Sequence, residues 1–191
     1  MVAHWHAAPM EHAEVLLIGG RAGVGKTTVG WEVSALLRSE AVAIIDGDFM
    51  GQVHPAPEGD PHRAEITESN LTAVWANFAQ RGYRRLIYTN TVSVLPEATG
   101  MFERAMGAGV GIIRVLLTAS DATARERLVG RERGSELEQE LEGSVRKARL
   151  LDQRAPAGTA RVATDGRLVV DIAREVVAAT GWVGPHFVRR S

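Results

Sequence analysis

An eight-residue stretch that begins at position 20, GRAGVGKT, matches the Walker A pattern G-x-x-x-x-G-K-[ST]. Its glycines let the backbone turn tightly and bring N–H groups close to phosphate oxygens with no Cβ in the way. Lys26 carries a mobile positive charge toward the β- and γ-phosphates, and the Thr27 hydroxyl is a ligand for Mg²⁺. The pattern predicts binding of a nucleoside triphosphate. The residues expected to contact it are Gly20, Ala22, Gly23, Val24, Gly25, Lys26, Thr27 and Thr28.

The residues around this stretch support the prediction. The apolar run VLLI at 15–18 is typical of a strand buried on both faces. After the glycines, Val29, Val33 and Leu36 recur at helical spacing. Strand, loop and helix therefore occur in the order that a phosphate-binding loop requires, which an incidental glycine-rich turn containing a lysine would not provide.

Composition sets the broad class. The chain has 191 residues, no cysteine and a net charge of −1. This suits one domain and excludes a disulfide framework, and it offers no basic face for nucleic acid. No apolar run approaches the roughly 20 residues that cross a bilayer. We expect a cytoplasmic monomer or homodimer that binds neither membrane nor nucleic acid. Its expected parts are a flexible leader at 1–13, a single domain at 14–181 and a tail at 182–191.

Strand and helix patterns alternate along the domain. Further strands are expected at 42–45, 86–88, 112–117 and 161–163. Helices are expected at 65–80, at 96–106, at 121–151 with a break near Gly134, and at 169–179. This alternation predicts an α/β fold with a parallel sheet covered on both faces. Ligands of such sheets bind at the carboxyl ends of the strands.

Two carboxylates follow the second strand, in the sequence Asp46-Gly47-Asp48. In a parallel sheet they would lie close to the Walker A loop. One carboxylate can then hold Mg²⁺ or its water shell, while the other orients an acceptor hydroxyl and takes its proton. The alternative is a turn in which both side chains bond only to local backbone.

With these motifs, the chain resembles the small P-loop kinases over about residues 14–180. The group includes adenylylsulfate, gluconate, shikimate and adenylate kinases, chloramphenicol phosphotransferase and tunicamycin-resistance ATP-binding proteins. The resemblance implies a P-loop NTPase fold: a five-stranded parallel sheet in the order 2-3-1-4-5, flanked by helices, with a short mobile lid at about 121–140. It also implies that Asp46 supports Mg²⁺ and that Asp48 binds the acceptor as the base, although the two roles are exchangeable at this point.

The lid and the adenine site rest on the same resemblance. The run RLVGR at 127–131 is similar to the entry of the adenylate kinase lid, where one arginine contacts adenine or phosphate and the next clamps the transferred group. Arg127 and Arg131 are the candidates, with Arg133 a weaker one. An ordinary salt-bridged helix face is the alternative, because arginines and glutamates alternate here. Asp165 and Gly166 are expected beside adenine, by resemblance alone.

Several departures narrow the class. No Asp ends the third strand, so the usual Walker B carboxylate is missing. No [NT]-K-x-D sequence follows, which argues against a GTPase. The chain is also too short for an AAA+ motor with a helical appendage. The Asp-Gly-Phe-Pro-Arg stretch of nucleoside monophosphate kinases is also absent. The acceptor is expected between the 46–62 connection and the next helix. Candidate lining residues are Phe49, His54, His62, Arg63, Asn70 and Trp75, with Thr89, Asn90 and Thr91 at the strand end; Trp75 also fits the core.

Together these features predict an ATP- and Mg²⁺-dependent phosphotransferase. Its catalytic residues would be Lys26, Asp46, Asp48, Arg127 and Arg131, with Thr27 and Asp46 at the metal. The acceptor would be a hydroxyl or phosphate of a small molecule such as an antibiotic, a nucleoside, a nucleotide or a sugar acid. The alternative is an ATP-binding resistance or sensor protein that transfers no phosphoryl group.

Overall fold

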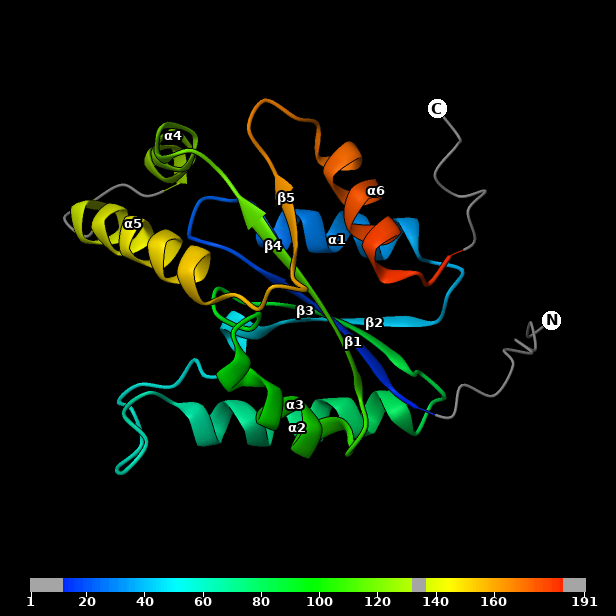
Figure 1. The fold of residues 1–191 in the computed structure, drawn as a ribbon. Helices are drawn as coiled ribbons and strands as arrows, with labels where there is room; N and C mark the ends of the chain where they lie inside the picture. The colour runs from blue at the N-terminus through cyan, green and yellow to red at the C-terminus, as the bar shows by residue number, and fades with distance from the viewer. Residues whose placement is uncertain (1–11, 132–136, 184–191) are drawn as a thin grey trace.

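Five parallel strands form the centre of the molecule (Figure 1). The computed structural model describes residues 12–131 and 137–183. The strands are β1 (Glu14–Gly19), β2 (Val42–Asp46), β3 (Arg85–Thr89), β4 (Gly111–Thr118) and β5 (Ala160–Ala163). Their order in the sheet is β2-β3-β1-β4-β5. This confirms the predicted parallel sheet and its order.

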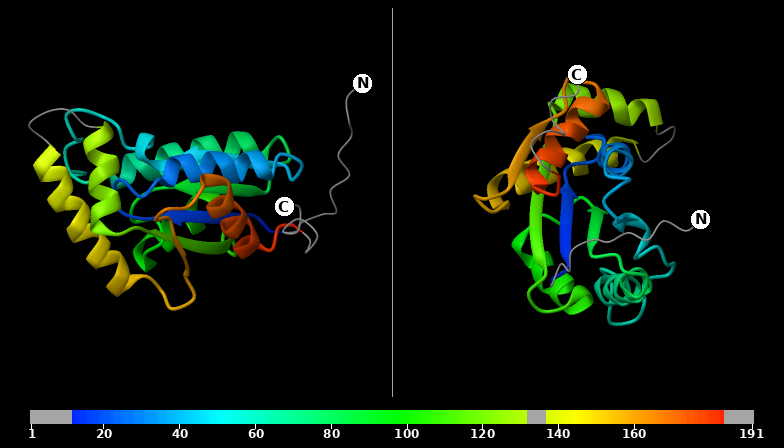
Figure 2. Two further views of the ribbon diagram at one scale, coloured as in Figure 1. Left: turned by 90° about the horizontal axis from the view of Figure 1, so that it is seen from above. Right: turned by 90° about the vertical axis from the view of Figure 1, so that its right-hand side faces the viewer.

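Helices cover both faces of the sheet (Figures 1 and 2). The α-helices are α1 (Lys26–Leu36), α2 (Ala64–Ala79), α3 (Thr99–Met106), α4 (Asp121–Arg131), α5 (Leu137–Arg154) and α6 (Val169–Thr180), and the 3₁₀ helices are η1 (Gly47–Phe49) and η2 (Pro96–Ala98). Helices α1 and α6 pack together on one face, and α2 and α3 pack together on the other. Helices α4 and α5 lie beyond the carboxyl end of β4, close to the Walker A loop.

The alternation of side chains along β1 builds two hydrophobic cores. Leu16 and Ile18 face the cluster under α1 and α6, and Val15 and Leu17 face the cluster under α2 and α3. All four side chains are fully buried. A strand that is apolar at every position is stable only when both faces are covered, which explains why the run at 15–18 lacks polar residues.

The register of the sheet aligns three strand ends. Thr89, the last residue of β3, lies opposite Ile18 of β1 and opposite Asp46 of β2. The segments that follow these strands therefore start at the same edge of the sheet. They are the Walker A loop, the turn at Asp48 and the polar residues after β3.

One predicted element differs from the structure in detail. The helix expected at 96–106 is a 3₁₀ turn, η2, followed by α3. The charged stretch, expected to be helical with a break, forms the two helices α4 and α5. Gly134, where a break was expected, lies outside the described residues. Trp182, assigned by the sequence to the tail, packs into the core, and the Arg85 guanidinium lies 5.3 Å from its ring. In the part of the chain that the structure covers, we find no helix with the length and apolarity needed to cross a membrane.

Candidate nucleotide and acceptor sites

The Walker A loop requires glycine for two distinct reasons. Gly23 has φ +81°, and a Cβ added there would lie 2.7 Å from the carbonyl oxygen of Ala124. Gly25, the residue just before α1, has φ +97°, but an added Cβ would meet no atom within 4 Å. Space and backbone conformation both exclude a side chain at Gly23, whereas conformation alone does so at Gly25. The loop is thus shaped so that its backbone faces the adjoining cavity.

A cavity of about 570 Å³ lies in front of this loop. Its lining residues are Ala22, Gly23, Gly25, Lys26, Thr27, Thr28, Asp46, Asp48, Phe49, Gln52, Thr91, Leu128 and Glu140. We call it the phosphate cavity. It brings together six of the eight predicted Walker A contacts and both carboxylates; Gly20 and Val24 belong to the loop but do not line it.

Thr27 and Asp46 form the pair that fits Mg²⁺. The Thr27 hydroxyl donates to Asp46 Oδ2 at 3.0 Å, and Asp46 Oδ1 accepts the backbone N–H of Asp48 at 3.1 Å. Hydroxyl and carboxylate oxygens are ligands that Mg²⁺ prefers, and this ion usually takes its other ligands from phosphate and water. Among the described residues, no group of three His, Asp or Glu side chains could hold a metal without such help.

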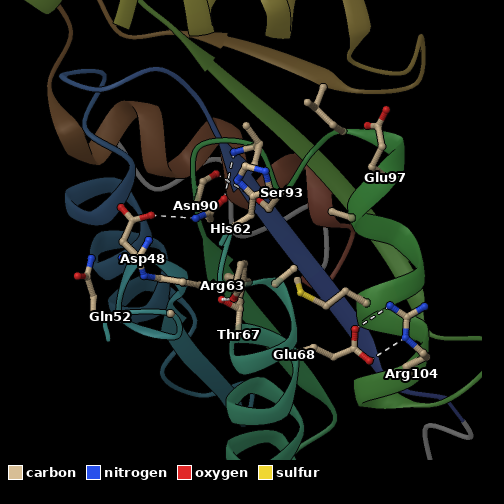
Figure 3. A pocket seen from close by; sticks show the side chains of 18 of the residues that line it. Asp48, Gln52, His62, Arg63, Thr67, Glu68, Asn90, Ser93, Glu97 and Arg104 are labelled. Atoms are coloured by element: carbon tan, nitrogen blue, oxygen red, sulfur yellow. Dashed lines mark hydrogen bonds and ion pairs between the residues drawn. The ribbon is translucent and has the colours of Figure 1, made fainter. Parts of the chain in front are cut away.

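Asp48 lines both the phosphate cavity and a larger cavity, whose lining is shown in Figure 3. The Asn90 amide donates to Asp48 Oδ1 at 2.9 Å, and Asn90 Oδ1 accepts the N–H of Val92 at 3.1 Å. The second bond fixes which end of the amide faces Asp48. Asp48 and Gln52 line both cavities.

The larger cavity, which we call the acceptor cavity, has a volume of about 780 Å³. Its lining residues are Gly47, Asp48, Gly51, Gln52, His54, His62, Arg63, Ala64, Thr67, Glu68, Tyr88, Asn90, Val92, Ser93, Leu95, Glu97, Ala98, Met101 and Arg104. It contains His54, His62, Arg63 and Asn90, as the sequence suggested. Phe49 and Thr91 line the phosphate cavity instead, and Thr89 and Trp75 are buried. Asn70 donates to the carbonyl of Met50 at 2.8 Å.

Two charge effects shape the acceptor cavity. Arg104 donates to both carboxylate oxygens of Glu68 at 2.7 Å, and these bonds lower the pKa of Glu68. Burial, with further contributions from Asp48 and Asp46, raises the pKa of the Tyr88 hydroxyl far above its usual range. At neutral pH the Tyr88 hydroxyl therefore stays protonated beside the two carboxylates.

Arg127 lies against the Walker A loop, and its guanidinium donates hydrogen bonds to protein oxygens. Its Nη1 donates to the Val24 carbonyl at 3.2 Å and to Thr164 Oγ1 at 3.1 Å, while Nη2 donates to the Thr164 carbonyl at 3.1 Å. Arg127 thus joins the loop to the chain after β5, and a phosphate contact for it stays a prediction. Arg131 ends α4, and its side chain, like the whole of Arg133, lies outside the described part of the chain.

Asp165 anchors the start of α4. Its carboxylate accepts the Ser120 hydroxyl at 2.7 Å and the Ser120 N–H at 3.0 Å. Hydrogen bonds from the hydroxyls of Thr123 and Ser120 and from the Ser120 backbone lower the pKa of Asp165 to about 2. Neither Asp165 nor Gly166, which has φ +63°, lines the two cavities. An adenine contact for this turn stays a prediction.

Sequence reasoning missed a buried arginine inside the Walker A motif. Arg21 is 5% exposed, donates to Ser144 Oγ at 2.8 Å and pairs with Asp121. Ser144 in turn donates to the Ala22 carbonyl at 2.9 Å. The Walker A loop is therefore bonded to both α4 and α5. The signal was weak because Arg21 occupies a variable position of the motif and its partners are 100 and 123 residues away.

Comparisons with known proteins agree with this geometry. Residues 15–156 match the model of a family described as AAA domain. A search of curated protein sequences found no significant match. Within the described residues, only α6 follows β5, so the helical appendage of an AAA+ motor is not found among them.

Solved structures resemble the fold over most of its length. A gluconokinase from Sinorhizobium meliloti 1021 has 19% identity and a TM-score of 0.57, covering 87% of this chain and 90% of that one. The Deinococcus radiodurans tunicamycin resistance protein has 19% identity and a TM-score of 0.60, covering 89% and 96%. The Mycobacterium tuberculosis APS kinase, in complex with AMPPNP and APS, has 17% identity and a TM-score of 0.53, covering 88% and 98%.

These matches confirm the resemblance to the small P-loop kinases, and the sheet has the order that this resemblance implied. The chain belongs to the AAA domain family, and its fold is that of the small P-loop kinases.

Proposed function

We propose that this protein is an ATP- and Mg²⁺-dependent phosphotransferase that acts on a small molecule. One observation carries the proposal: Asp48 lines both the phosphate cavity and the acceptor cavity. A transferred group must pass from one ligand to the other at such a junction. A protein that only binds nucleotide has no need for a second cavity that shares a carboxylate with the first.

Asp48 is oriented for proton transfer. Its Oδ1 accepts the Asn90 amide, and its Oδ2 makes no hydrogen bond with any described residue. As the acceptor oxygen attacks the γ-phosphorus, Asp48 takes the hydroxyl proton, and the bond from that phosphorus to the bridging oxygen breaks to release ADP. Asp46 is held toward Thr27, which favours the metal role for Asp46 and the base role for Asp48.

The Walker A loop supplies charge stabilisation. ATP, when bound, provides the γ-phosphoryl group. Thr27 and Asp46 would hold Mg²⁺, which would supply positive charge next to the phosphate oxygens. Lys26 has only 9% of its surface exposed and lines the phosphate cavity, so its charge acts in a partly dry site where electrostatic effects are stronger. The predicted contributions of Arg127 and Arg131 belong to the same proposal.

Proteins of similar fold act on hydroxylated small molecules, as the names gluconokinase and shikimate kinase indicate. We propose an acceptor of this general kind, with antibiotics, nucleosides and nucleotides as further candidates. ATP is the donor, so we assign the reaction to the cytoplasm.

The test is ADP release from Mg-ATP by the purified protein, with a panel of sugar acids, nucleosides, nucleotides and hydroxylated antibiotics. We expect one acceptor class to stimulate ADP release and to gain one phosphoryl group in mass spectrometry. Replacing Asp48→Asn should lower this stimulated rate by about 100-fold or more, because general base catalysis is lost. Nucleotide affinity should stay within about twofold.

Asp171→Asn is the matched control, because Asp171 lies on α6 and lines neither cavity. It should leave the stimulated rate unchanged. Tight ATP binding with no stimulation by any acceptor, and with the same behaviour in Asp48→Asn, would contradict the proposal and indicate a binding protein.

A further inference from the structure

The acceptor cavity contains an arginine that forms no ion pair with a carboxylate of any described residue. Its charged Asp, Glu and Arg side chains are Asp48, Arg63, Glu68, Glu97 and Arg104. Glu68 pairs with Arg104, and Glu97 pairs with Arg154. Within residues 12–131 and 137–183, Asp48 and Arg63 are left without an ion pair. The proposed reaction uses Asp48, which leaves Arg63 unexplained.

The Arg63 side chain is held in place while its terminal nitrogens stay available. Its Nε donates to the Val53 carbonyl at 3.0 Å. The two terminal nitrogens make no hydrogen bond to any residue that the structure describes. In Figure 3, Arg63 lies on the same side of the cavity as Asp48 and Gln52, and the Glu68–Arg104 pair lies at the other end.

The backbone of Arg63 is in a conformation that a residue with a side chain rarely adopts. Its φ and ψ are 57° and 28°, in the left-handed region. The N–H of Arg63 donates to the Asp60 carbonyl at 2.9 Å, and its own carbonyl accepts the Thr67 hydroxyl at 2.6 Å. Glycine is the usual residue at such a position. Strained residues of this kind cluster at binding sites, where the surrounding structure holds them in place.

We propose that the terminal nitrogens of Arg63 bind an oxyanion of the acceptor, a carboxylate or a phosphate, while an acceptor hydroxyl faces Asp48. This rests on the proposed function and names its substrate class: hydroxylated acids or phosphorylated hydroxy compounds rather than neutral polyols or nucleosides. A guanidinium suits this role because its two terminal nitrogens match two anionic oxygens. Val92, Leu95 and Met101 line the cavity as well and can receive the carbon skeleton.

The first measurement is direct binding by calorimetry in the presence of Mg²⁺ and AMPPNP. Three matched pairs differ by one anionic group: D-gluconate and D-glucitol, shikimate and methyl shikimate, and uridine monophosphate and uridine. In at least one pair the anionic member should bind about 10- to 100-fold more tightly. A difference in affinity within a carboxylate pair identifies the oxyanion as a carboxylate, and a difference within the phosphate pair identifies it as a phosphate.

Arg63→Gly is the decisive variant, because glycine accepts the left-handed backbone while removing the guanidinium. It should abolish the preference for the anionic member, leaving binding of the neutral member and of AMPPNP unchanged. Arg63→Lys should keep part of the preference, since it retains the charge but not the fork of donors. Arg81→Gln, at an exposed arginine outside both cavities, is the matched control and should behave as the wild type.

Equal affinity for both members of every pair would overturn the proposal, as would a preference that persists in a folded Arg63→Gly protein. Turnover is measured separately. Tighter binding of an anionic ligand that depends on Arg63, without acceptor-stimulated ADP release, would support the anion site and contradict the proposed phosphotransferase activity. Stimulated turnover of an anionic acceptor that Arg63→Gly does not change would contradict the anion site alone.

Discussion

At the scale of single residues, the Walker A loop shows why a short pattern has predictive value. The fixed positions of the pattern each meet a separate physical requirement, and the contacts of these residues in the structure show what that requirement is. At Gly23, both the lack of space and the backbone conformation exclude a side chain. The Thr27 hydroxyl donates a hydrogen bond to Asp46 at the end of β2. Such residues are recognisable from sequence because the constraint lies within a few positions of the chain.

The double constraint at Gly23 gives a stability prediction. Gly23→Ala should lower the free energy of unfolding by about 1–2 kcal/mol from the left-handed backbone alone, and further because the added Cβ meets the Ala124 carbonyl. ATP affinity should also fall, since the loop must shift. Urea unfolding and nucleotide titration measure the two effects. Gly158→Ala, where a Cβ meets no atom within 4 Å, is the control and should change neither.

At the scale of elements, the start of α2 depends on a residue outside the helix. The Asp60 carboxylate accepts the backbone N–H groups of Ala64 at 2.6 Å and Glu65 at 2.9 Å, although it is only 7% exposed. Helix starts leave such donors unpaired, and a carboxylate is a strong acceptor for them. Sequence periodicity placed the helix start near Glu65 but did not identify Asp60, because the intervening loop has no regular pattern.

This cap predicts a loss of stability together with a loss of acceptor binding. Asp60→Ala should reduce the free energy of unfolding by about 1–2 kcal/mol, the usual effect of removing such a cap. Because the Asp60 carboxylate also holds the backbone directly after Arg63, the acceptor KM should rise while the KM for ATP stays constant. Asp60→Asn keeps one acceptor oxygen and should lose less stability. Chemical denaturation of the two variants measures this effect. A free energy of unfolding equal to that of the wild type in both would argue against the cap.

The junction of β4 with α4 predicts a pH dependence. The folded-state pKa of Asp165 is about 2, below its ordinary value of 3.8. A lowered acid pKa contributes stability above the unfolded value, and this contribution is lost as the pH falls from about 3.8 toward about 2. The difference in unfolding free energy between wild type and Asp165→Asn should be constant above about pH 5 and narrow below about pH 4. A pH-independent difference in urea unfolding would contradict this assignment.

At the scale of the whole molecule, the sheet was predictable and the long-range contacts were not. Alternating strand and helix patterns indicate a parallel sheet, and the resemblance supplied its order, which the structure confirms. The bonds of Arg21 to Asp121 and Ser144 depend on how α4 and α5 are placed, which no local pattern encodes. For the same reason, no local pattern predicted the bonds of Arg127 to Val24 and Thr164.

The lining of the acceptor cavity has a consequence for how such a protein diversifies. Every residue that lines it lies between Gly47 and Arg104, in one uninterrupted part of the chain. The Walker A loop, α4 and α5 lie outside that part. Changes confined to this single contiguous segment can therefore alter the acceptor cavity while leaving the Walker A loop and Asp46 unchanged. Recombination within a gene needs only two crossover points to do the same.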